Sequence, residues 1–193
     1  MSEKLSLVRQ IMKPELEIVN VVGSGELPFD GLNLEQLAED IDAEVKEHEG
    51  SGKDFVFENG GLTLYDSGKY IIRAANEELV YATHNELLDE LLDLDLPIGI
   101  RDDIKFEICN FVGHGKLNRS VDLIKLSIAF GLENTEYETE QFPALISREY
   151  DVVTLIYGNG NVILPGASTK EELERVFDEL VADIEDISER IGL

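Results

Sequence analysis

The chain has 193 residues, of which 43% are apolar, and this length supports one sizeable core or two small ones. The single cysteine, Cys109, excludes an internal disulfide and a cluster of thiolate metal ligands. Acidic residues number 41 against 16 basic ones, so the net charge of −25 should repel nucleic acid at physiological salt. The sequence has no run of membrane-spanning length and no signal pattern, so we expect a cytosolic protein.

The acidic residues are spread along the whole chain, with 22 in residues 1–98 and 19 in residues 99–193. Two explanations compete for this charge. One is a surface adapted to very high salt, where screening removes most self-repulsion, and the other is a basic partner. The even spread favours the first, because a single basic partner would be met by a concentrated patch.

In chain order, a strand, a helix and a β-hairpin come first. Residues 16–27 read LEIVNVVGSGEL, which is a β-rich run, and residues 34–41 carry apolar side chains at helical spacing. In residues 62–75, two β-rich runs flank Ser67-Gly68. A two-residue turn that ends in glycine between two strands predicts a hairpin.

A long amphipathic helix is expected after this hairpin, and its start has two alternatives. Thr83 with Glu86 forms a capping box, so the helix could begin there. The preceding segment, residues 76–82, is then an added turn and strand. Alternatively, the helix begins earlier, at Asn76.

The second half of the chain repeats these elements. Residues 106–117, FEICNFVGHGKL, are identical to residues 16–27 at 7 of 12 positions, and residues 154–167 predict a hairpin around Asn159-Gly160. Ser168 and Glu171 form a capping box that predicts the start of the last helix. Its apolar stripe consists of Leu173, Val176, Phe177, Leu180, Val181, Ile184 and Ile187.

This duplication predicts an α+β fold. Each copy reads as a strand, a helix, three or four antiparallel strands and a long helix. One layer of helices covers only one face of a sheet. We therefore expect the first strands of the two copies to pair into one curved antiparallel sheet, with all helices on one side and an open concave face on the other.

Residues that could carry catalysis or bind a metal ion are sparse. His48, His84 and His114 stand singly, without the spacing of a zinc site. The Gly-x-Gly segments at residues 23–25 and 113–115 lack the remainder of a phosphate-binding loop. We expect neither an enzyme nor a bound cofactor or metal.

The segment from Glu133 to Ala167 carries a specific resemblance. Within it, Tyr137 to Arg148 read Tyr-Glu-x-Glu-x-Phe-Pro-x-Leu-Ile-x-Arg, and with this motif and the duplication the chain resembles the TATA-box-binding protein family of archaea and eukaryotes. The acidic composition resembles the form found in halophilic archaea. The resemblance divides the chain into an extension of residues 1–14 with a short amphipathic pattern, a first repeat of residues 15–98 and a second of residues 99–193.

The resemblance implies a pseudo-symmetric saddle with helices on its convex face, in a family that is a standard example of minor-groove binding to kinked DNA. It assigns the central hydrogen-bond donors to Asn20 and Asn110, and strand alternation puts Val22 and Val112 on the same face. Both asparagines could instead be polar residues at strand ends. Their recurrence at matched positions favours the DNA role.

In this family, paired aromatic side chains near each end of the saddle insert between base steps. The resemblance assigns this role to Phe142 and Tyr157 in the second repeat and to Tyr65 in the first, although each could be a core aromatic. The first repeat lacks the Phe-Pro string. Phe55 and Phe57 are either shifted into the wedge role or ordinary strand residues. The second reading is favoured, and it implies DNA kinked mainly at one end.

Further contacts with DNA follow from the same resemblance. Apolar residues of the DNA face also include Ile71, Leu155 and Ile163. Arg148 is expected at the groove edge, and Lys53 and Lys69 are candidate phosphate contacts in the first repeat. Arg73 and Pro165 stand where the family has a small hydroxyl residue.

Glu138 and Glu140 match the family's contact for transcription factor B, although they could also be solvated loop charges. The resemblance implies a nucleoid-associated transcription initiation factor that binds AT-rich (TATA-box) promoter DNA through the minor groove. It would recruit transcription factor B and act as a monomer with internal pseudo-symmetry. The alternative is a divergent paralogue that has lost DNA binding and acts as a protein-binding transcription regulator.

Overall fold

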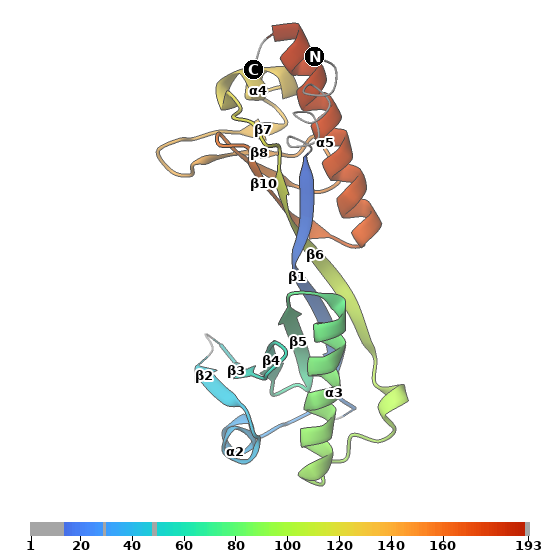
Figure 1. Cartoon of the computed structure of the whole chain (residues 1–193). Helices are drawn as coiled ribbons and strands as arrows, with labels where there is room; N and C mark the ends of the chain where they lie inside the picture. Colours follow the sequence, from blue (N-terminus) through green and yellow to red (C-terminus); the bar gives the residue numbers. More distant parts are fainter. Residues whose placement is uncertain (1–13, 29, 48–49, 192–193) are drawn as a thin grey trace. The chain divides into compact units, whose positions relative to one another are not determined.

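The computed structural model of the chain describes residues 14–28, 30–47 and 50–191 (Figure 1). Residues 1–13, which form most of the expected extension, and His48 lie outside the described residues. The elements in chain order are β1 (Glu15–Glu26), α2 (Leu34–Asp40), β2 (Glu44–Glu47), β3 (Gly52–Val56), β4 (Gly61–Tyr65), β5 (Lys69–Ala74), α3 (Glu77–Asp93), η1 (Arg101–Asp103), β6 (Phe106–Lys116), α4 (Leu123–Phe130), β7 (Thr135–Glu136), β8 (Ala144–Ser147), β9 (Thr154–Tyr157), β10 (Asn161–Ala167) and α5 (Lys170–Ile191).

The chain forms two compact units. The N-terminal unit contains Asn20–Asn110, and the C-terminal unit contains the residues up to Val19 together with Phe111–Leu193. The long strands β1 and β6 therefore each contribute one end to either unit. The boundary between the expected sequence repeats, at residues 98 and 99, stays a prediction.

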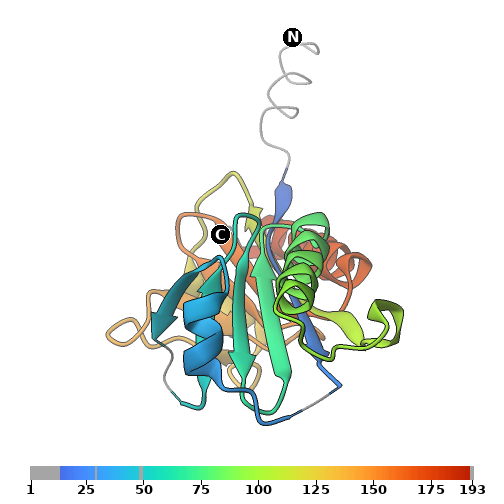
Figure 2. The ribbon, with the colours of Figure 1, turned by 90° about the horizontal axis from the view of Figure 1, so that it is seen from below.

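In the N-terminal unit the strand order is β2-β3-β4-β5-β1-β6, and the pairs from β2 to β1 are antiparallel. Helix α3 packs along β5, and α2 lies near β3, where Glu35 pairs with Lys53 (Figure 2). Side chains alternate along β5. Tyr70 and Ile72 are buried on the side of α3, whereas Ile71 and Arg73 belong to the opposite face.

Helix α3 begins at the earlier of the two expected starts. The side chain of Asn76 accepts a hydrogen bond from the backbone N–H of Leu79 at 2.9 Å and so caps the helix. Thr83, the other candidate cap, lies inside the helix, where its hydroxyl donates to the carbonyl of Leu79. The helix therefore begins at the upstream cap, Asn76, and the Thr83–Glu86 pattern falls within its apolar stripe and does not start a helix.

The C-terminal unit has the strand order β1-β6-β10-β9-β8-β7, with α5 packed on β10 and α4 against β8. The apolar stripe expected for α5 is confirmed at Leu173, Val176, Phe177, Leu180, Ile184 and Ile187, which are buried, whereas Val181 is partly exposed. Its cap differs by one residue. Thr169 accepts from the N–H of Glu172, and Glu172 accepts from the N–H of Ser168, so the capping box is Thr169–Glu172 rather than Ser168–Glu171.

Both expected hairpins are present. In the first, the N–H of Gly68 donates to the carbonyl of Tyr65, and in the second that of Gly160 donates to Tyr157. Gly68 and Gly160 have φ angles of 82° and 87°, which explains why glycine ends both turns.

The repeated Gly-x-Gly segments lie within strands β1 and β6 and have a packing role. A Cβ at Gly25 would collide with the ring of Tyr70, and one at Gly115 would collide with the ring of Phe177. Each ring therefore packs directly on the strand backbone, which only glycine allows. His114 also lies within β6.

His84 is buried in an aromatic cluster of the N-terminal unit. Its ring stacks on Phe106 with centroids 4.1 Å apart, and the Tyr70 hydroxyl lies 3.1 Å from its Nδ1. Burial, with a smaller contribution from the positive charge of Arg101, lowers the pKa of His84 from 6.5 to about 4. The histidine is therefore neutral at pH 7 and serves the core.

We expect this histidine to make the fold sensitive to acid. Its pKa is lower in the folded state, so the unfolded chain binds the proton first as pH falls, and stability drops between about pH 6.5 and 4. The full loss is about 3 kcal/mol, at about 1.4 kcal/mol for each pKa unit. Urea unfolding of wild type and His84→Gln at several pH values measures it. The carboxylates titrate in both proteins, so only His84 can make the two pH dependences of the unfolding free energy differ. The same pH dependence in both proteins would contradict the expectation.

Candidate nucleic-acid interface

In each unit, the part of the ten-stranded sheet that belongs to it has one face away from the helices, which we call the open face of that unit. In the C-terminal unit, Leu155, Tyr157 and Ile163 are partly exposed, whereas the residues that alternate with them, such as Ile156 and Val162, are fully buried. Leu155 pairs directly with Ile163 across the strands. The predicted residues therefore share the open face.

The apolar surface formed by Leu155 and Ile163 continues onto β6. There Val112 is partly exposed and pairs with Pro165. It lies between Phe111 and Gly113, which are both buried on the helix side. The open face of the C-terminal unit is therefore mainly apolar across three adjacent strands.

In the N-terminal unit, the predicted residues Asn20, Val22, Tyr65, Ile71 and Asn110 are all partly exposed. Asn20 and Asn110 lie on the neighbouring strands β1 and β6, within one compact unit. Each alternates with a residue buried on the helix side, Val21 and Phe111 respectively. Such half-buried amides keep donors available at the open surface.

The two predicted wedges of the C-terminal unit lie together. The rings of Phe142 and Tyr157 meet edge to face, with centroids 6.2 Å apart and planes inclined by 60°. The N–H of Phe142 donates to the carbonyl of Glu138 at 2.9 Å, which closes the loop before β8. Glu138 and Glu140 are exposed on this loop.

The N-terminal unit has no aromatic residue at the place of Phe142. Gly52 pairs with Tyr65 as Ala144 pairs with Tyr157, so Gly50 and Ser51 occupy the positions of Phe142 and Pro143. Phe55 and Phe57 are 0% and 5% exposed and belong to the core. Of the two sequence interpretations, the ordinary strand role is therefore the one the structure has.

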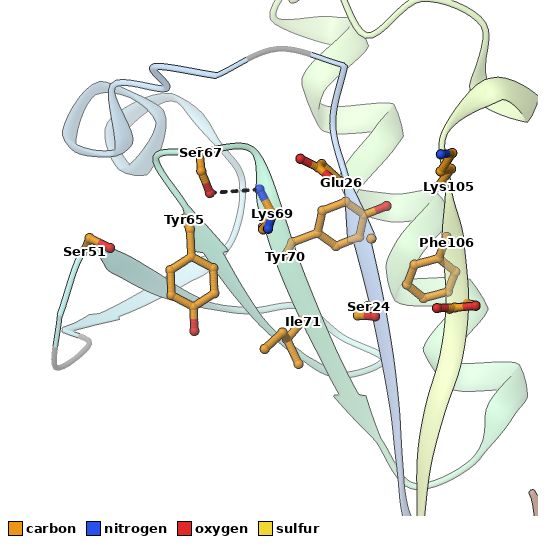
Figure 3. Close-up of a pocket in the computed structure, with 12 residues that line it drawn as sticks. Ser24, Glu26, Ser51, Tyr65, Ser67, Lys69, Tyr70, Ile71, Lys105 and Phe106 are labelled. Atoms are coloured by element: carbon orange, nitrogen blue, oxygen red, sulfur yellow. Dashed lines mark hydrogen bonds between the residues drawn. The ribbon is translucent and has the colours of Figure 1, made fainter. Parts of the chain in front are cut away.

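A hollow of about 910 Å³ lies on the N-terminal unit (Figure 3). Tyr65 on β4 and Phe106 on β6 lie on opposite sides of it, Ser24 and Ile71 lie between them, and Ser51 lines its outer end beyond Tyr65. Small side chains thus occupy the end of the sheet that carries a Phe-Pro pair in the other unit.

The predicted phosphate contacts differ in availability. Lys69 is exposed, and Arg148 is exposed but forms an ion pair with Glu136 at 2.7 Å. The interpretation of Lys53 as a phosphate contact is wrong. Its side chain points to the helix side, is 8% exposed and pairs with Glu35 of α2 at 3.1 Å.

A polar group on the N-terminal open face was missed by the sequence reasoning. The Thr63 hydroxyl donates to Asp54 Oδ1 at 2.6 Å and accepts from Arg73 Nη1 at 3.0 Å. A comparison of the two repeats could have found it, because Asp54 and Thr63 correspond to the apolar residues Ile146 and Leu155, 92 positions further along the chain. A polar residue in one repeat at the position of an apolar residue in the other shows that the two open faces differ there in chemistry.

Among the described residues there is no group of three or more acidic, histidine or cysteine side chains that could hold a metal ion. A search of the same residues finds no helix long and apolar enough to cross a membrane.

A family model and two curated relatives agree on one family. The family model described as "Transcription factor TFIID (or TATA-binding protein, TBP)" matches residues 105–187. TATA-box-binding protein C of Halobacterium salinarum is 36% identical over 182 residues, which cover 89% of this chain and 98% of that protein. The TATA-box-binding protein of Haloarcula marismortui is 32% identical and covers 91% of this chain and 96% of its own length.

A solved structure gives the same result. Methanococcus jannaschii TBP aligns with a TM-score of 0.73 and 29% identity, and the alignment covers 89% of this chain and 99% of that one. This likeness confirms the expected α+β class with an open antiparallel sheet and helices.

Proposed function

Because the chain belongs to the TATA-box-binding protein family, it is a transcription initiation factor and not an enzyme, and we propose that it binds AT-rich promoter DNA through the minor groove. In this proposal the open faces contact the groove, and transcription factor B binds beside the DNA. The protein acts as a monomer, since each chain supplies two pseudo-symmetric units.

The observation that carries this proposal is the chemistry of the open faces. An A·T pair offers only the acceptors adenine N3 and thymine O2 in the minor groove. Reading it requires few donors, which Asn20 and Asn110 supply, and otherwise an apolar surface. Val112, Leu155 and Ile163 provide that surface in the C-terminal unit, and the Phe142–Tyr157 pair at its edge has the shape of a wedge.

We expect Asn110→Ala and Phe142→Ala each to weaken binding to a TATA-like duplex in molar KCl. Each removes a donor or a wedge, at a cost of about 1–3 kcal/mol, or roughly 5- to 150-fold in Kd. A gel shift measures this. Ile128→Ala is the matched control, because Ile128 is 65% exposed on helix α4 and does not belong to the open face. Wild-type affinity in all three variants would contradict the proposed interface.

Affinity should rise with salt. With a net charge of −25, electrostatic repulsion between protein and DNA opposes binding at low salt. The protein also has few cationic side chains that could displace counterions from the DNA phosphates. Molar KCl screens the repulsion, and apolar burial then dominates. Fluorescence anisotropy across a KCl series measures the trend. The steep loss of affinity that most DNA-binding proteins display would overturn this expectation.

We expect DNA to be unstacked mainly at one end of its site. Phe142 and Tyr157 form a pair in the C-terminal unit, whereas Gly50 stands at the position of Phe142 in the N-terminal unit. 2-Aminopurine placed at either end of the site reports unstacking as increased fluorescence. The increase should be large at one end only. Equal signals at both ends in wild type would count against this reading.

Recruitment of transcription factor B is expected to depend on Glu138 and Glu140, whose carboxylates are exposed beside the aromatic pair. Glu138→Gln with Glu140→Gln should weaken the ternary complex several-fold and leave binary DNA binding unchanged, because exposed charges contribute modestly to affinity. The control is Glu185→Gln with Glu189→Gln, an equal loss of charge on exposed positions of α5. Equal effects of the two double variants would attribute the result to net charge alone.

One observation favours a second candidate function. Asp54 lies on the N-terminal open face, Lys53 points away from it, and Arg148 is engaged by Glu136. An exposed carboxylate on this face, with few cationic side chains available beside it, suits a paralogue that binds proteins instead of DNA. The gel shift separates the two: this candidate predicts no DNA shift at any salt concentration, together with retained binding of transcription factor B.

A further inference from the structure

The open faces of the two units differ in kind at three matched positions. The C-terminal unit has Ile146, Leu155 and Pro165, and the N-terminal unit has Asp54, Thr63 and Arg73 at the positions 92 residues earlier. Strand register supports this match, because Asp54 pairs with Thr63 as Ile146 pairs with Leu155. Aliphatic side chains in one unit are thus replaced by a hydrogen-bonded polar group in the other.

The polar group has a defined direction of hydrogen bonding. The single hydroxyl proton of Thr63 goes to Asp54 Oδ1, and Arg73 donates to the Thr63 oxygen. Thr63 is 1% exposed, whereas Asp54 is partly and Arg73 largely exposed. The buried hydroxyl therefore holds an acceptor and a donor side by side at the surface, and their formal charges cancel.

This arrangement complements the minor-groove edge of a G·C pair. That edge presents guanine N3 and cytosine O2 as acceptors and, unlike A·T, the guanine N2 amino group as a donor. A carboxylate has about four lone-pair sites and can accept from the amino group while it holds Thr63. A guanidinium with five N–H donors can donate to the acceptors.

We propose that the N-terminal unit accepts a G·C pair in its half of the promoter site, with Asp54 as the acceptor for guanine N2 and Arg73 as the donor. This inference rests on the proposed function, because it requires the open face to contact the groove. The C-terminal unit has only Ile146, Leu155 and Pro165 at the matching positions. A guanine amino group buried there loses its hydrogen bond to water and gains none, which is costly.

The consequence is a polar promoter site, with one half restricted to A·T and the other tolerant of G·C. Such a site fixes which unit lies on which half, and so the orientation of the bound protein.

The test uses wild-type protein in molar KCl with four duplexes that share one site length. The first is all A·T, the second has a G·C pair in one half, the third has G·C at mirrored positions of both halves, and the fourth has inosine in place of each guanine of the third. Inosine lacks the N2 amino group, so the fourth duplex presents the groove edge of A·T. Each mirrored pair of positions is examined in turn.

We expect the one-half duplex, at one of these positions, to bind within about 3-fold of the all-A·T duplex. The protein can place its tolerant unit on the G·C half, so the outcome does not require the orientation to be known. The two-half duplex should lose at least about 10-fold, the usual effect of an unfavourable base pair, and inosine should restore it.

Variants of the polar group identify its role. Asp54→Ile with Thr63→Leu introduces the residues of the C-terminal unit, and the one-half duplex should then lose at least about 10-fold relative to the all-A·T duplex. Asp54→Asn retains a carbonyl acceptor and should keep most of the tolerance, which covers the case in which the double variant does not fold. Glu39→Gln, at an exposed position on α2, controls for the loss of one negative charge.

The outcomes separate the inference from the proposed function. Two results would overturn the inference alone. In the first, the protein binds the all-A·T duplex but loses as much affinity for the one-half duplex as for the two-half duplex. In the second, the Asp54→Ile, Thr63→Leu protein folds and still binds the one-half duplex as wild type does. No binding of any duplex overturns the proposed function and this inference with it.

Discussion

The alternation of side chains along β-strands constrains this molecule more than any other feature. In each unit the helices cover one face of the sheet, so every second residue of a strand enters the core and the next lies on the open face. Tyr70 and Phe177 pack so tightly on the strand backbone that only glycine is accommodated beneath them. This packing fixes which residues are presented on the open faces, and the proposed function depends on those residues alone.

The two units meet this constraint with different chemistry. The C-terminal unit presents aliphatic residues and the Phe142–Tyr157 pair, whereas the N-terminal unit presents Tyr65, a hollow lined in part by serines, and the Asp54–Thr63–Arg73 group. Duplication produced similar backbones and matched registers. The differences between the open faces alter what each half can contact without disturbing the core, because open-face residues do not pack against the helices.

The charge of the protein and the chemistry of its proposed interface are consistent with each other at high salt. Several cationic side chains are engaged by carboxylates, including Lys53 with Glu35 and Arg148 with Glu136, so counterion release makes a small contribution. Apolar contact and a few central amides remain, and screening by concentrated salt weakens neither. The relatives named above come from halophilic archaea.

The sequence by itself determined the duplication, the two glycine-ended hairpins and the amphipathic stripe of α5, because these are local patterns read from spacing and turn chemistry. The resemblance assigned Leu155, Tyr157 and Ile163 to one face, and the alternation of buried and partly exposed residues along β9 and β10 agrees with this. Only the tertiary structure decided that Phe55 and Phe57 enter the core, that Gly50 stands at the place of Phe142, and that Lys53 turns toward α2. The physical reason is strand register: a shift of one residue exchanges the two faces of a strand, and hydrogen bonding between strands distant in sequence sets that register.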